Sequence, residues 1–398
     1  MDALANLRQT TGTARCLACG KCSTMCPLAH EGGFSARRIA GQDLHDEIEG
    51  RGIGVGRCLT CASCEVRCPE GVQFTEFVRG LRALVPPELR RPTPHGGVFQ
   101  SAARSMAEGL VPNRKPDWLG EGLEVAEEGP VALFVGCAPY FDTYFADLGV
   151  RTLESARAAI AVLNAQGIKP VLIGEERCCG HDLLWQGERE PFEELARANV
   201  AAFKSRGIKH IITTCAECTR TWKVDYADVD SEYTPRVQHF AEYLDGLVQA
   251  GKVQFQADGV QRITYQDPCR LGRHLGVLDE PRRVLQALPD TQLTEMHRSG
   301  RDAVCCGTSG FIHCNAASRR LQEQRLQEAA DTGAETLVTA CPKCLIHFAC
   351  AQSEDRLRQG KEPQIHVEDF TVLTARLLVS EDAESKAVPV PSGQEAGE

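Results

Sequence analysis

A pattern of five cysteines is written twice in the second half of the chain, and it constrains the fold more than any other feature of the sequence. Each copy has a lone cysteine, then a Cys-Cys-Gly triplet, then a Cys-x2-Cys pair. The copies comprise Cys137, Cys178, Cys179, Cys215 and Cys218, and then Cys269, Cys305, Cys306, Cys341 and Cys344. Because the gaps between corresponding cysteines nearly match, the repetition indicates one structural unit used twice.

The chemistry of these cysteines points to a metal or redox site. Adjacent cysteines suit a disulfide framework poorly, because each partner must reach a separate thiol at a set Cα distance. Five soft thiolates fit an iron–sulfur cluster better than tetrahedral zinc, which is filled by four. Structural zinc and redox-inert buried thiols are the alternatives. The 398 residues include 20 cysteines and begin without an apolar signal segment, so we expect a reducing, cytoplasmic location.

Short apolar, β-branched runs precede most of these cysteines, and helical patterns lie between them. Strands are predicted at 131–135, 170–173, 210–214, 262–265 and 336–339, and helices at 153–166, 192–205 and 318–330. This alternation predicts α/β units with short parallel sheets. The cysteines then follow the carboxyl ends of the strands, where open α/β sheets bind their ligands.

Two further cysteine runs lie near the N-terminus. Both read C-x2-C-x2-C-x3-C-P, the run that holds [4Fe–4S] cubanes in bacterial-type ferredoxins. The fourth thiolate of each run crosses to the other cluster in that arrangement. We therefore assign one cubane to Cys16, Cys19, Cys22 and Cys68, and the other to Cys58, Cys61, Cys64 and Cys26. A pair of zinc knuckles is disfavoured, because zinc does not need four cysteines packed so closely, twice.

The chain divides into five segments on these patterns. A helical ferredoxin-like domain is expected at 1–85, with helices at 35–49 and 74–84. A proline-rich surface linker with a short helix at 100–109 follows at 86–130. The two repeats occupy 131–250 and 251–378, each closed by a helix, at 237–248 and 367–378. The acidic tail 379–398 is expected to be disordered.

Charge and missing motifs exclude several classes of function. The formal charge of −10 argues against nucleic acid as a partner, since a nucleic-acid binding face is basic. No apolar run approaches the roughly 20 residues that a membrane helix needs, so any membrane association must come through a partner. The glycines at 41–56 follow no predicted strand and match no phosphate-binding fingerprint. With no flavin or nicotinamide motif, electrons must come from another protein.

A few other polar residues lie near the predicted cluster loops. His181 and His274 are either proton donors or structural histidines, and His313 and His347 carry less weight. Lys343 and Arg273 either neutralise cluster or substrate charge or lie in solvent. Cys314 and Cys350 stand outside both repeats, and we expect them to behave as small buried hydrophobes.

The combination of two ferredoxin runs with two Cys-Cys-Gly repeats resembles the D subunit of heterodisulfide reductase, a fusion of the C and B subunits of that enzyme. The resemblance extends from about Arg15 to Leu378 and includes the flanking words DPCRLGRH at 267–274 and ACPKC at 340–344. It implies two cubane and two non-cubane [4Fe–4S] clusters, each repeat of five cysteines holding one non-cubane cluster. It also implies that a small-molecule disulfide is split between the two non-cubane clusters.

The resemblance further implies a larger complex, with electrons delivered by a flavoprotein or a membrane cytochrome. The motif Arg57-Cys-Leu-Thr-Cys61 is also similar to iron–sulfur subunits of glycolate- and lactate-oxidising complexes. Those relatives often lack some cysteines of the repeats, whereas both repeats here are complete. Completeness favours disulfide or thiol chemistry, and a non-catalytic electron relay within a 2-hydroxyacid dehydrogenase is the alternative.

Overall fold

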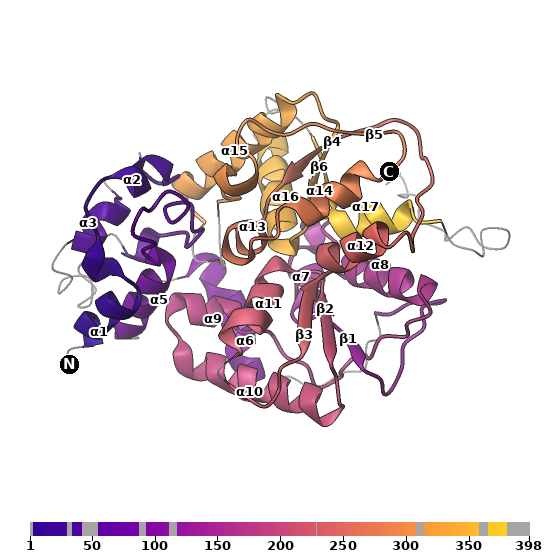
Figure 1. Ribbon diagram of the computed structural model, residues 1–398, viewed down its shortest axis with the longest axis horizontal. Helices are drawn as coiled ribbons and strands as arrows, with labels where there is room; N and C mark the ends of the chain where they lie inside the picture. Colours follow the sequence, from indigo (N-terminus) through magenta and orange to yellow (C-terminus); the bar gives the residue numbers. More distant parts are fainter. Residues whose placement is uncertain are drawn as a thin grey trace.

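The computed structural model consists of a small helical unit followed by two α/β repeats (Figure 1). It describes residues 3–29, 34–41, 55–86, 93–110, 118–227, 229–307, 311, 314–357 and 365–379, apart from the side chains of 354–357. The fold class predicted from the sequence is confirmed: short parallel sheets occur in both repeats, and the described part of the N-terminal unit is helical.

The N-terminal unit packs short helices around its cysteine loops. Its elements are α1 (Ala3–Thr10), η1 (Thr13–Arg15), α2 (Lys21–Met25), α3 (Ala36–Gly41), η2 (Val55–Arg57) and α5 (Phe74–Leu84). Helix α5 is amphipathic and buries Phe74, Phe77, Val78 and Leu81, which the i, i+3, i+4, i+7 spacing places on one face. The prediction of a helix at 74–84 is confirmed. The helix predicted at 35–49 begins as α3, and 42–49 lie outside the described residues.

The first repeat contains a three-stranded parallel sheet in the order β1-β2-β3. Its strands are β1 (Val131–Phe134), β2 (His210–Thr213) and β3 (Arg236–His239). Around them lie α7 (Ala138–Tyr144), η5 (Ala146–Leu148), α8 (Thr152–Ala165), α9 (His181–Gln186), α10 (Arg189–Ser205), α11 (Ala216–Arg220), η6 (Thr221–Asp225) and α12 (Phe240–Gln249). The run predicted as a strand at 170–173 contributes only single bridges from Val171 to Ala126 and Ala132.

The second repeat has the same topology as the first, and its sheet has one additional strand. Its sheet has the order β5-β4-β6-β7, formed by β4 (Gln261–Gln266), β5 (Thr291–Leu293), β6 (Thr336–Thr339) and β7 (His366–Asp369). Its helices are α13 (Cys269–Leu275), α14 (Asp279–Gln286), η7 (Gly300–Asp302), α15 (Ala316–Ala330), α16 (Pro342–Leu357) and α17 (Phe370–Arg376). Strand β5 occupies the place that Val171 holds in the first repeat, so the two cysteine patterns sit on equivalent scaffolds.

Two predicted helices were wrong at their beginnings. The helix predicted at 237–248 starts at Phe240, because 236–239 form β3, and the helix predicted at 367–378 starts at Phe370, because 366–369 form β7. In each case a polar N-cap ends the strand: His239 accepts from Ala241 N, and Asp369 accepts from Thr371 N. The cap converts the strand directly into a helix without a loop.

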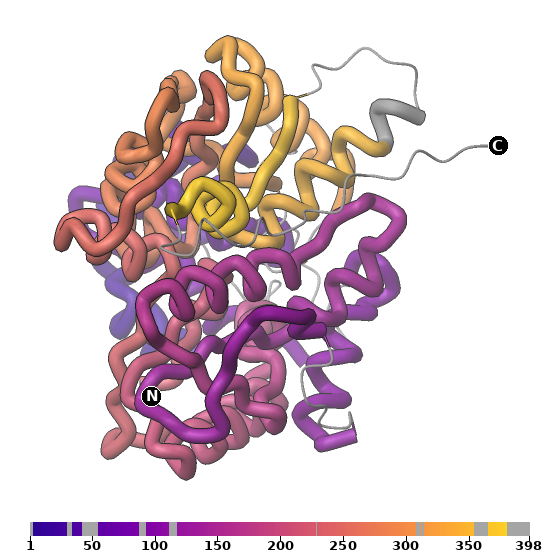
Figure 2. The backbone as a smooth tube through the Cα atoms, turned by 90° about the vertical axis from the view of Figure 1, so that its right-hand side faces the viewer, coloured from indigo at the N-terminus to yellow at the C-terminus, as the bar shows by residue number. Residues whose placement is uncertain are grey.

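Helices of the two repeats pack against each other across the boundary between the repeats. Helix α12 of the first repeat packs against α14 of the second, and α17 of the second packs against α8 of the first (Figures 1 and 2). Helix α6 (Val98–Ala107), in the segment predicted as a surface linker, is buried instead through Phe99, Gln100, Ala103 and Met106. The tail after Val379 lies outside the described residues.

Candidate iron–sulfur sites

Four of the predicted site cysteines lie just beyond the carboxyl ends of central strands. Cys137 and Cys215 follow β1 and β2, and Cys269 and Cys341 follow β4 and β6. Since parallel strands end at the same edge of a sheet, each pair is brought to one edge, as the strand–helix pattern predicts. Each of these cysteines also opens or directly precedes a helix (α7, α11, α13 and α16).

The five thiols of the first repeat lie together. The Sγ atoms of Cys218 and Cys179 are 3.5 Å apart. Cys178 contacts both Cys137 and Cys179, and Cys215 contacts Cys218, so the contacts form one unbroken series. The backbone N–H of Gly180 donates to Cys178 Sγ at 3.4 Å. A backbone donor aimed at sulfur stabilises the thiolate form, which is the form that binds metals.

The second repeat gathers its five thiols in the same order. Cys305 contacts Cys269 and Cys306, Cys306 contacts Cys344, and Cys344 contacts Cys341. His347 Nδ1 lies 3.3 Å from Cys306 Sγ, a contact that sequence reasoning gave little weight. The spacing of His347 three residues after Cys344 on α16 was the available signal, because residues three apart on a helix share a face.

Glycine is required in each Cys-Cys-Gly triplet. Gly180 and Gly307 both adopt left-handed backbone conformations, with φ of 78° and 96°. A Cβ atom at Gly307 would lie 2.6 Å from the carbonyl oxygen of Ser318, and one at Gly180 would lie 2.8 Å from the ring of Phe192. The left-handed turn lets two neighbouring thiols point into one site while Phe192 of α10, or the Ser318 backbone of α15, packs closely against the glycine.

The two N-terminal runs wrap their thiols with the same backbone shape. Ala18 and Thr60 occupy equivalent positions in the runs, and both have positive φ, 52° and 49°. The next equivalent pair, Gly20 and Ala62, is also left-handed, at 85° and 59°. Non-glycine residues adopt this conformation rarely, so its recurrence at matching positions indicates loops shaped around a common object.

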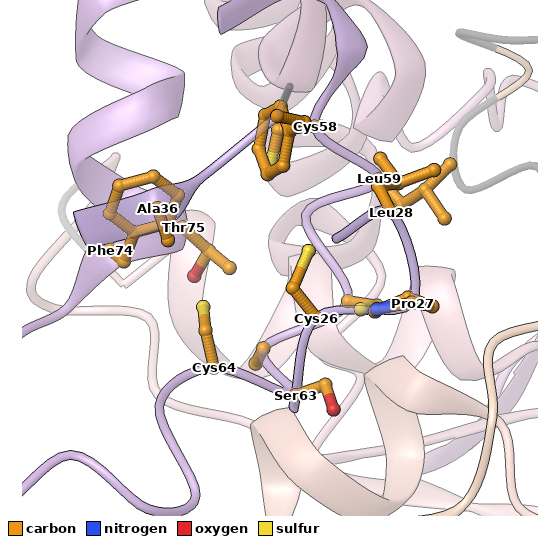
Figure 3. Close-up of a pocket in the computed structure, with 13 residues that line it drawn as sticks. Cys26, Pro27, Leu28, Ala36, Cys58, Leu59, Ser63, Cys64, Phe74 and Thr75 are labelled. Carbon is orange, nitrogen blue, oxygen red and sulfur yellow. The ribbon is translucent and has the colours of Figure 1, made fainter. Parts of the chain in front are cut away.

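The inner thiols of these runs line a shared cavity. Cys58, Cys61 and Cys64 line it together with Cys26 of the other run. Figure 3 shows Cys26, Cys58 and Cys64 directing their sulfur atoms toward the same space. The position of Cys26 beside the thiols of the other run is compatible with the predicted crossing of the fourth cysteine, which stays a prediction. Cys16 and Cys19 lie near Cys22 in an outer group, and the assignment of Cys68 to that group stays a prediction.

Two thiol contacts join the sites to one another. Cys61 of the inner ferredoxin site contacts Cys305 of the second repeat. Cys215 of the first repeat contacts Cys341 of the second. The inner ferredoxin site, the second repeat and the first repeat therefore form a continuous series, and the outer ferredoxin site adjoins it through Cys22 and Cys26.

The residues present fit iron–sulfur clusters better than free thiols. None of the 20 cysteines, all of which lie in the described part of the chain, forms a disulfide. Burial raises the pKa of Cys58 to about 11 and raises the pKa of Cys26 and Cys64 as well, whereas the contact with Cys305 and the charge of Arg273 lower the pKa of Cys61 to about 6. Crowded buried thiols of this kind ionise only when a cation compensates their charge, and iron supplies such a cation.

A buried ionic network spans the boundary between the repeats beside these sites. The ammonium of Lys343 pairs with the carboxylates of Asp182 and Glu217, and its side chain is 5% exposed. His181 Nδ1 lies 3.0 Å from Asp182 and 3.1 Å from Glu217. Arg270 Nε lies 2.9 Å from His181 Nε2. Because a guanidinium only donates, Nε2 accepts and Nδ1 carries the proton.

This network settles the alternatives that the sequence left open for Lys343. Lys343 is buried and paired, not solvated. His181, Asp182 and Glu217 are spaced closely enough for a metal ion, but Lys343 already provides their cation and the imidazole nitrogens are both engaged. Sequence reasoning missed Asp182 and Glu217. Their positions inside or beside the cysteine motifs were the available signal, since those loops converge.

The remaining candidates have mixed outcomes. His274 is half-buried, with Nε2 2.6 Å from Arg270 Nη1, and burial lowers its pKa, so it is a neutral junction residue. Cys314 is exposed and Cys350 is half-buried, so the expectation that both are buried was wrong for Cys314 and is met only in part for Cys350. His313 lies outside the described residues.

An aromatic cluster adjoins the boundary between the repeats and was not foreseen. Phe99 of α6 stacks on Phe311 with ring centroids 4.1 Å apart, and Phe141 and Phe145 complete the cluster. The Lys343 ammonium lies 4.8 Å from the centroid of the Phe311 ring. Cys137 packs against the same cluster. The face of the thiol sites beside Lys343 is thus apolar, and α6 covers it.

Comparison with known proteins agrees with this architecture. The cysteine-rich domain called CCG matches residues 131–223 and 263–349, and a 4Fe-4S dicluster domain matches residues 12–72. The chain belongs to the iron–sulfur proteins that combine these two domain types. Its relatives include the D subunit of the dihydromethanophenazine:CoB–CoM heterodisulfide reductase of Methanosarcina acetivorans, 33% identical over 66% of this chain. The resemblance predicted from the motifs is therefore confirmed.

Other relatives are named for different activities. An EtfAB:quinone oxidoreductase of Syntrophomonas wolfei is 30% identical over 57% of this chain, and the match spans 32% of that protein. The chain spans 62% of the length of the Methanosarcina relative. Among the helices that the structure describes, none combines the length and apolar character needed to cross a bilayer.

Proposed function

We propose that this chain conducts electrons through two cubane [4Fe–4S] clusters to a pair of non-cubane [4Fe–4S] clusters, at which a small-molecule disulfide is reduced or two thiols are oxidised. The observation that carries this proposal is the continuous series of thiol sites, joined by the contacts Cys61–Cys305 and Cys215–Cys341. Electron transfer requires closely spaced centres, and the series supplies them from the exposed N-terminal loop to the boundary between the repeats.

The ligand assignments are those predicted from the cysteine patterns, and contacts within the sites support them except for Cys68. The cubanes would be held by Cys16, Cys19, Cys22 and Cys68, and by Cys58, Cys61, Cys64 and Cys26. The non-cubane clusters would be held by Cys137, Cys178, Cys179, Cys215 and Cys218, and by Cys269, Cys305, Cys306, Cys341 and Cys344. When bound, such clusters pass electrons singly, and a paired site supplies the two electrons that cleaving a disulfide to two thiols consumes.

Residues at the boundary between the repeats would serve this chemistry by excluding water and fixing charge. The aromatic cluster of Phe99, Phe141, Phe145 and Phe311 packs beside Cys137 and closes one side to solvent. Lys343 is held beside the two thiol sites by Asp182 and Glu217, which offset its charge, so it would act there as a fixed hydrogen-bond donor. A preorganised donor in a dry site needs no reorganisation during the reaction.

A second function is favoured by the similarity to the EtfAB:quinone oxidoreductase. In that case the chain is an electron relay within a larger complex, and all four sites only conduct. The complex would contain a flavoprotein or a membrane cytochrome as the partner that supplies or accepts electrons. Both functions share the clusters and differ in whether a disulfide reacts at the paired repeats.

The test is to purify the chain without oxygen, quantify its iron, sulfide and zinc, and record Mössbauer and EPR spectra before and after adding a disulfide. Four [4Fe–4S] clusters, about 16 irons per chain, with a non-cubane component that responds to the disulfide would support disulfide chemistry. The same clusters without a response would support the relay. About 8 irons, all cubane, would overturn both functions proposed for the repeats.

A further inference from the structure

Within the part of the chain that the structure describes, three arginines surround the loop between Cys58 and Cys61 without a carboxylate partner. Arg82 and Arg270 are buried, at 6% and 1% exposure, and Arg273 is half-buried. None of the three forms an ion pair with an acidic side chain among the described residues, although Arg79 and Arg220 of the same junction both pair with Glu76 and Asp225.

The three guanidinium groups instead donate to the backbone of this loop. Arg82 donates to Val55 O at 3.0 Å and to Cys58 O at 2.6 Å. Arg270 donates to Thr60 O at 2.5 Å and to Thr60 Oγ1 at 2.8 Å. Arg273 donates to Cys61 O at 2.6 Å. Carbonyl oxygens accept these hydrogen bonds, Arg82 Nε and Arg273 Nη2 have no partner among the described residues, and the three positive charges have no ion-pair partner there.

These arginines come from distant parts of the chain. Arg82 lies in α5, whereas Arg270 and Arg273 lie in α13 beside Cys269. Arg270 also packs over the ring of Trp185, 3.9 Å from its centroid, and Arg82 donates to Trp185 O at 2.8 Å. Elements of all three units therefore meet at the short loop between Cys58 and Cys61. The guanidinium charges of the three arginines lie beside this loop.

The outer ferredoxin loop has a different environment. Leu17 is 64% exposed and Cys19 is exposed, so water can solvate charge there. The guanidinium of Arg37, itself in an exposed position, donates to Ala18 O of this loop at 3.5 Å. The thiols of the inner loop are buried, so solvent does not reach them in the same way. Two sites of identical sequence pattern therefore stabilise negative charge by different means.

We propose that Arg82, Arg270 and Arg273 are the counter-charge of the inner cubane and raise its reduction potential, so that it accepts electrons from the solvated outer cubane. This inference rests on the proposed binding of a cubane by Cys58, Cys61, Cys64 and Cys26. Reduction adds one electron, and hence one negative charge, to a buried group, which burial alone disfavours. Fixed positive charges offset that cost, and cluster potentials respond to nearby charge and hydrogen bonds.

An acidic residue, Glu65, follows Cys64 in the same run, and its carboxyl accepts from Thr75 N at 2.6 Å. None of the three arginines forms an ion pair with it among the described residues, so their guanidinium groups remain directed at the 58–61 loop.

The experiment is an EPR-monitored redox titration of the full chain, purified without oxygen. Arg270→Met and Arg82→Met should lower the ratio of reduced to oxidised inner cubane at a fixed potential at least about tenfold, which corresponds to 59 mV for one electron. Arg79→Met is the matched control, because Arg79 belongs to the same junction but pairs with carboxylates, and it should leave the potential unchanged. A Cys19→Ser variant assigns the outer signal, whose potential should not move in the Met variants.

The outcomes separate this inference from the proposed function. An unchanged potential in fully loaded Met variants would overturn it. Where a Met variant fails to bind iron at the inner site, Arg270→Lys and Arg82→Lys decide: loading restored by lysine supports a role of charge, and loading lost again overturns the inference in favour of a purely structural role. Absence of a cubane from the inner site of the unmutated chain would overturn the proposed function itself.

Discussion

The Lys343 ammonium of the second repeat is paired with the Asp182 carboxylate of the first, in a region closed to solvent. Lys343 lies between Cys341 and Cys344, and Asp182 follows the triplet that ends at Gly180. The cysteine motifs therefore carry, beside their thiols, the charged residues that hold the two repeats together. Ion pairs of this kind fix the register of two surfaces, since neither partner can be left alone in a buried site.

Replacing Lys343 by methionine should destabilise the boundary between the repeats. The change leaves the carboxylates of Asp182 and Glu217 buried without their cation, which costs about 3–5 kcal/mol. We expect a lowered unfolding temperature together with loss of iron from both repeats. The triple variant Lys343→Met, Asp182→Asn, Glu217→Gln should regain part of the stability. Lys204→Met, which breaks an exposed pair with Asp230, should change little. Equal effects of the two lysine variants would contradict this account.

Gly307→Ala should destabilise the second repeat by more than the cost of placing alanine in a left-handed backbone conformation. Alanine at a positive φ costs about 1–2 kcal/mol, and at Gly307 its Cβ would also meet Ser318 O at 2.6 Å. Gly276→Ala is the matched control, because its φ is 76° and an added methyl group there would meet no atom within 4 Å. Thermal unfolding and iron content of both variants measure the difference. If Gly276→Ala is as harmful as Gly307→Ala, the clash is not the cause.

The cysteine assignments can be separated by single serine substitutions. Cys215→Ser removes a thiol at the contact between the repeats and should lower iron content and perturb the non-cubane spectrum. Cys314→Ser and Cys350→Ser lie outside both patterns and should retain the iron content of the unmutated chain. Retention of full iron by Cys215→Ser would remove it from the proposed ligands.

Much of the architecture could be predicted because the central strands are apolar and the cysteine spacing is repeated. Strands β2, β4 and β6 lie in the middle of their sheets, and β1 is flanked on its open side by the bridge to Val171, so their buried faces leave apolar runs. The edge strands β3, β5 and β7 have sequences RVQH, TQL and HVED, which carry no such run. An edge strand has one paired neighbour and is partly solvated, so its sequence resembles a loop or a helix start.

The sequence points to Lys343, Arg273 and His181, but it does not predict their partners, because these contacts join residues far apart in the chain. Arg270 meets Thr60 across 210 positions, and Lys343 meets Asp182 across 161. Spacing identifies thiols that share a cluster loop, but it carries no information about which loop of one repeat faces a loop of another. That information depends on how α12, α14, α17 and α8 pack across the boundary.

Asp369 gives the protein a pH-dependent stability that an asparagine should remove. Burial raises the pKa of this carboxyl from 3.8 to about 6, while its Oδ1 caps α17 by accepting from Thr371 N. Below pH 3.8 the carboxyl is protonated in both folded and unfolded chains and has no effect. Between pH 3.8 and about 6 the unfolded chain ionises first, so stability falls as pH rises, by about 3 kcal/mol in total. Above about pH 6 the carboxyl is ionised in both the folded and the unfolded chain, so the loss of stability no longer changes with pH.

Asp369→Asn retains a cap acceptor and removes the ionisation. The unfolding temperature of the variant relative to the unmutated chain should therefore rise between pH 3.8 and about 6 and level off above that. The measurement is a series of anaerobic thermal unfolding curves across that range, with Asp230→Asn as the control, because Asp230 is only partly buried and pairs with Lys204 at the surface. Within this range, the difference in unfolding temperature depends on pH only if the folded Asp369 carboxyl holds a proton. A difference that stays constant across the range would therefore show that Asp369 is already ionised in the folded protein, and it would contradict the prediction.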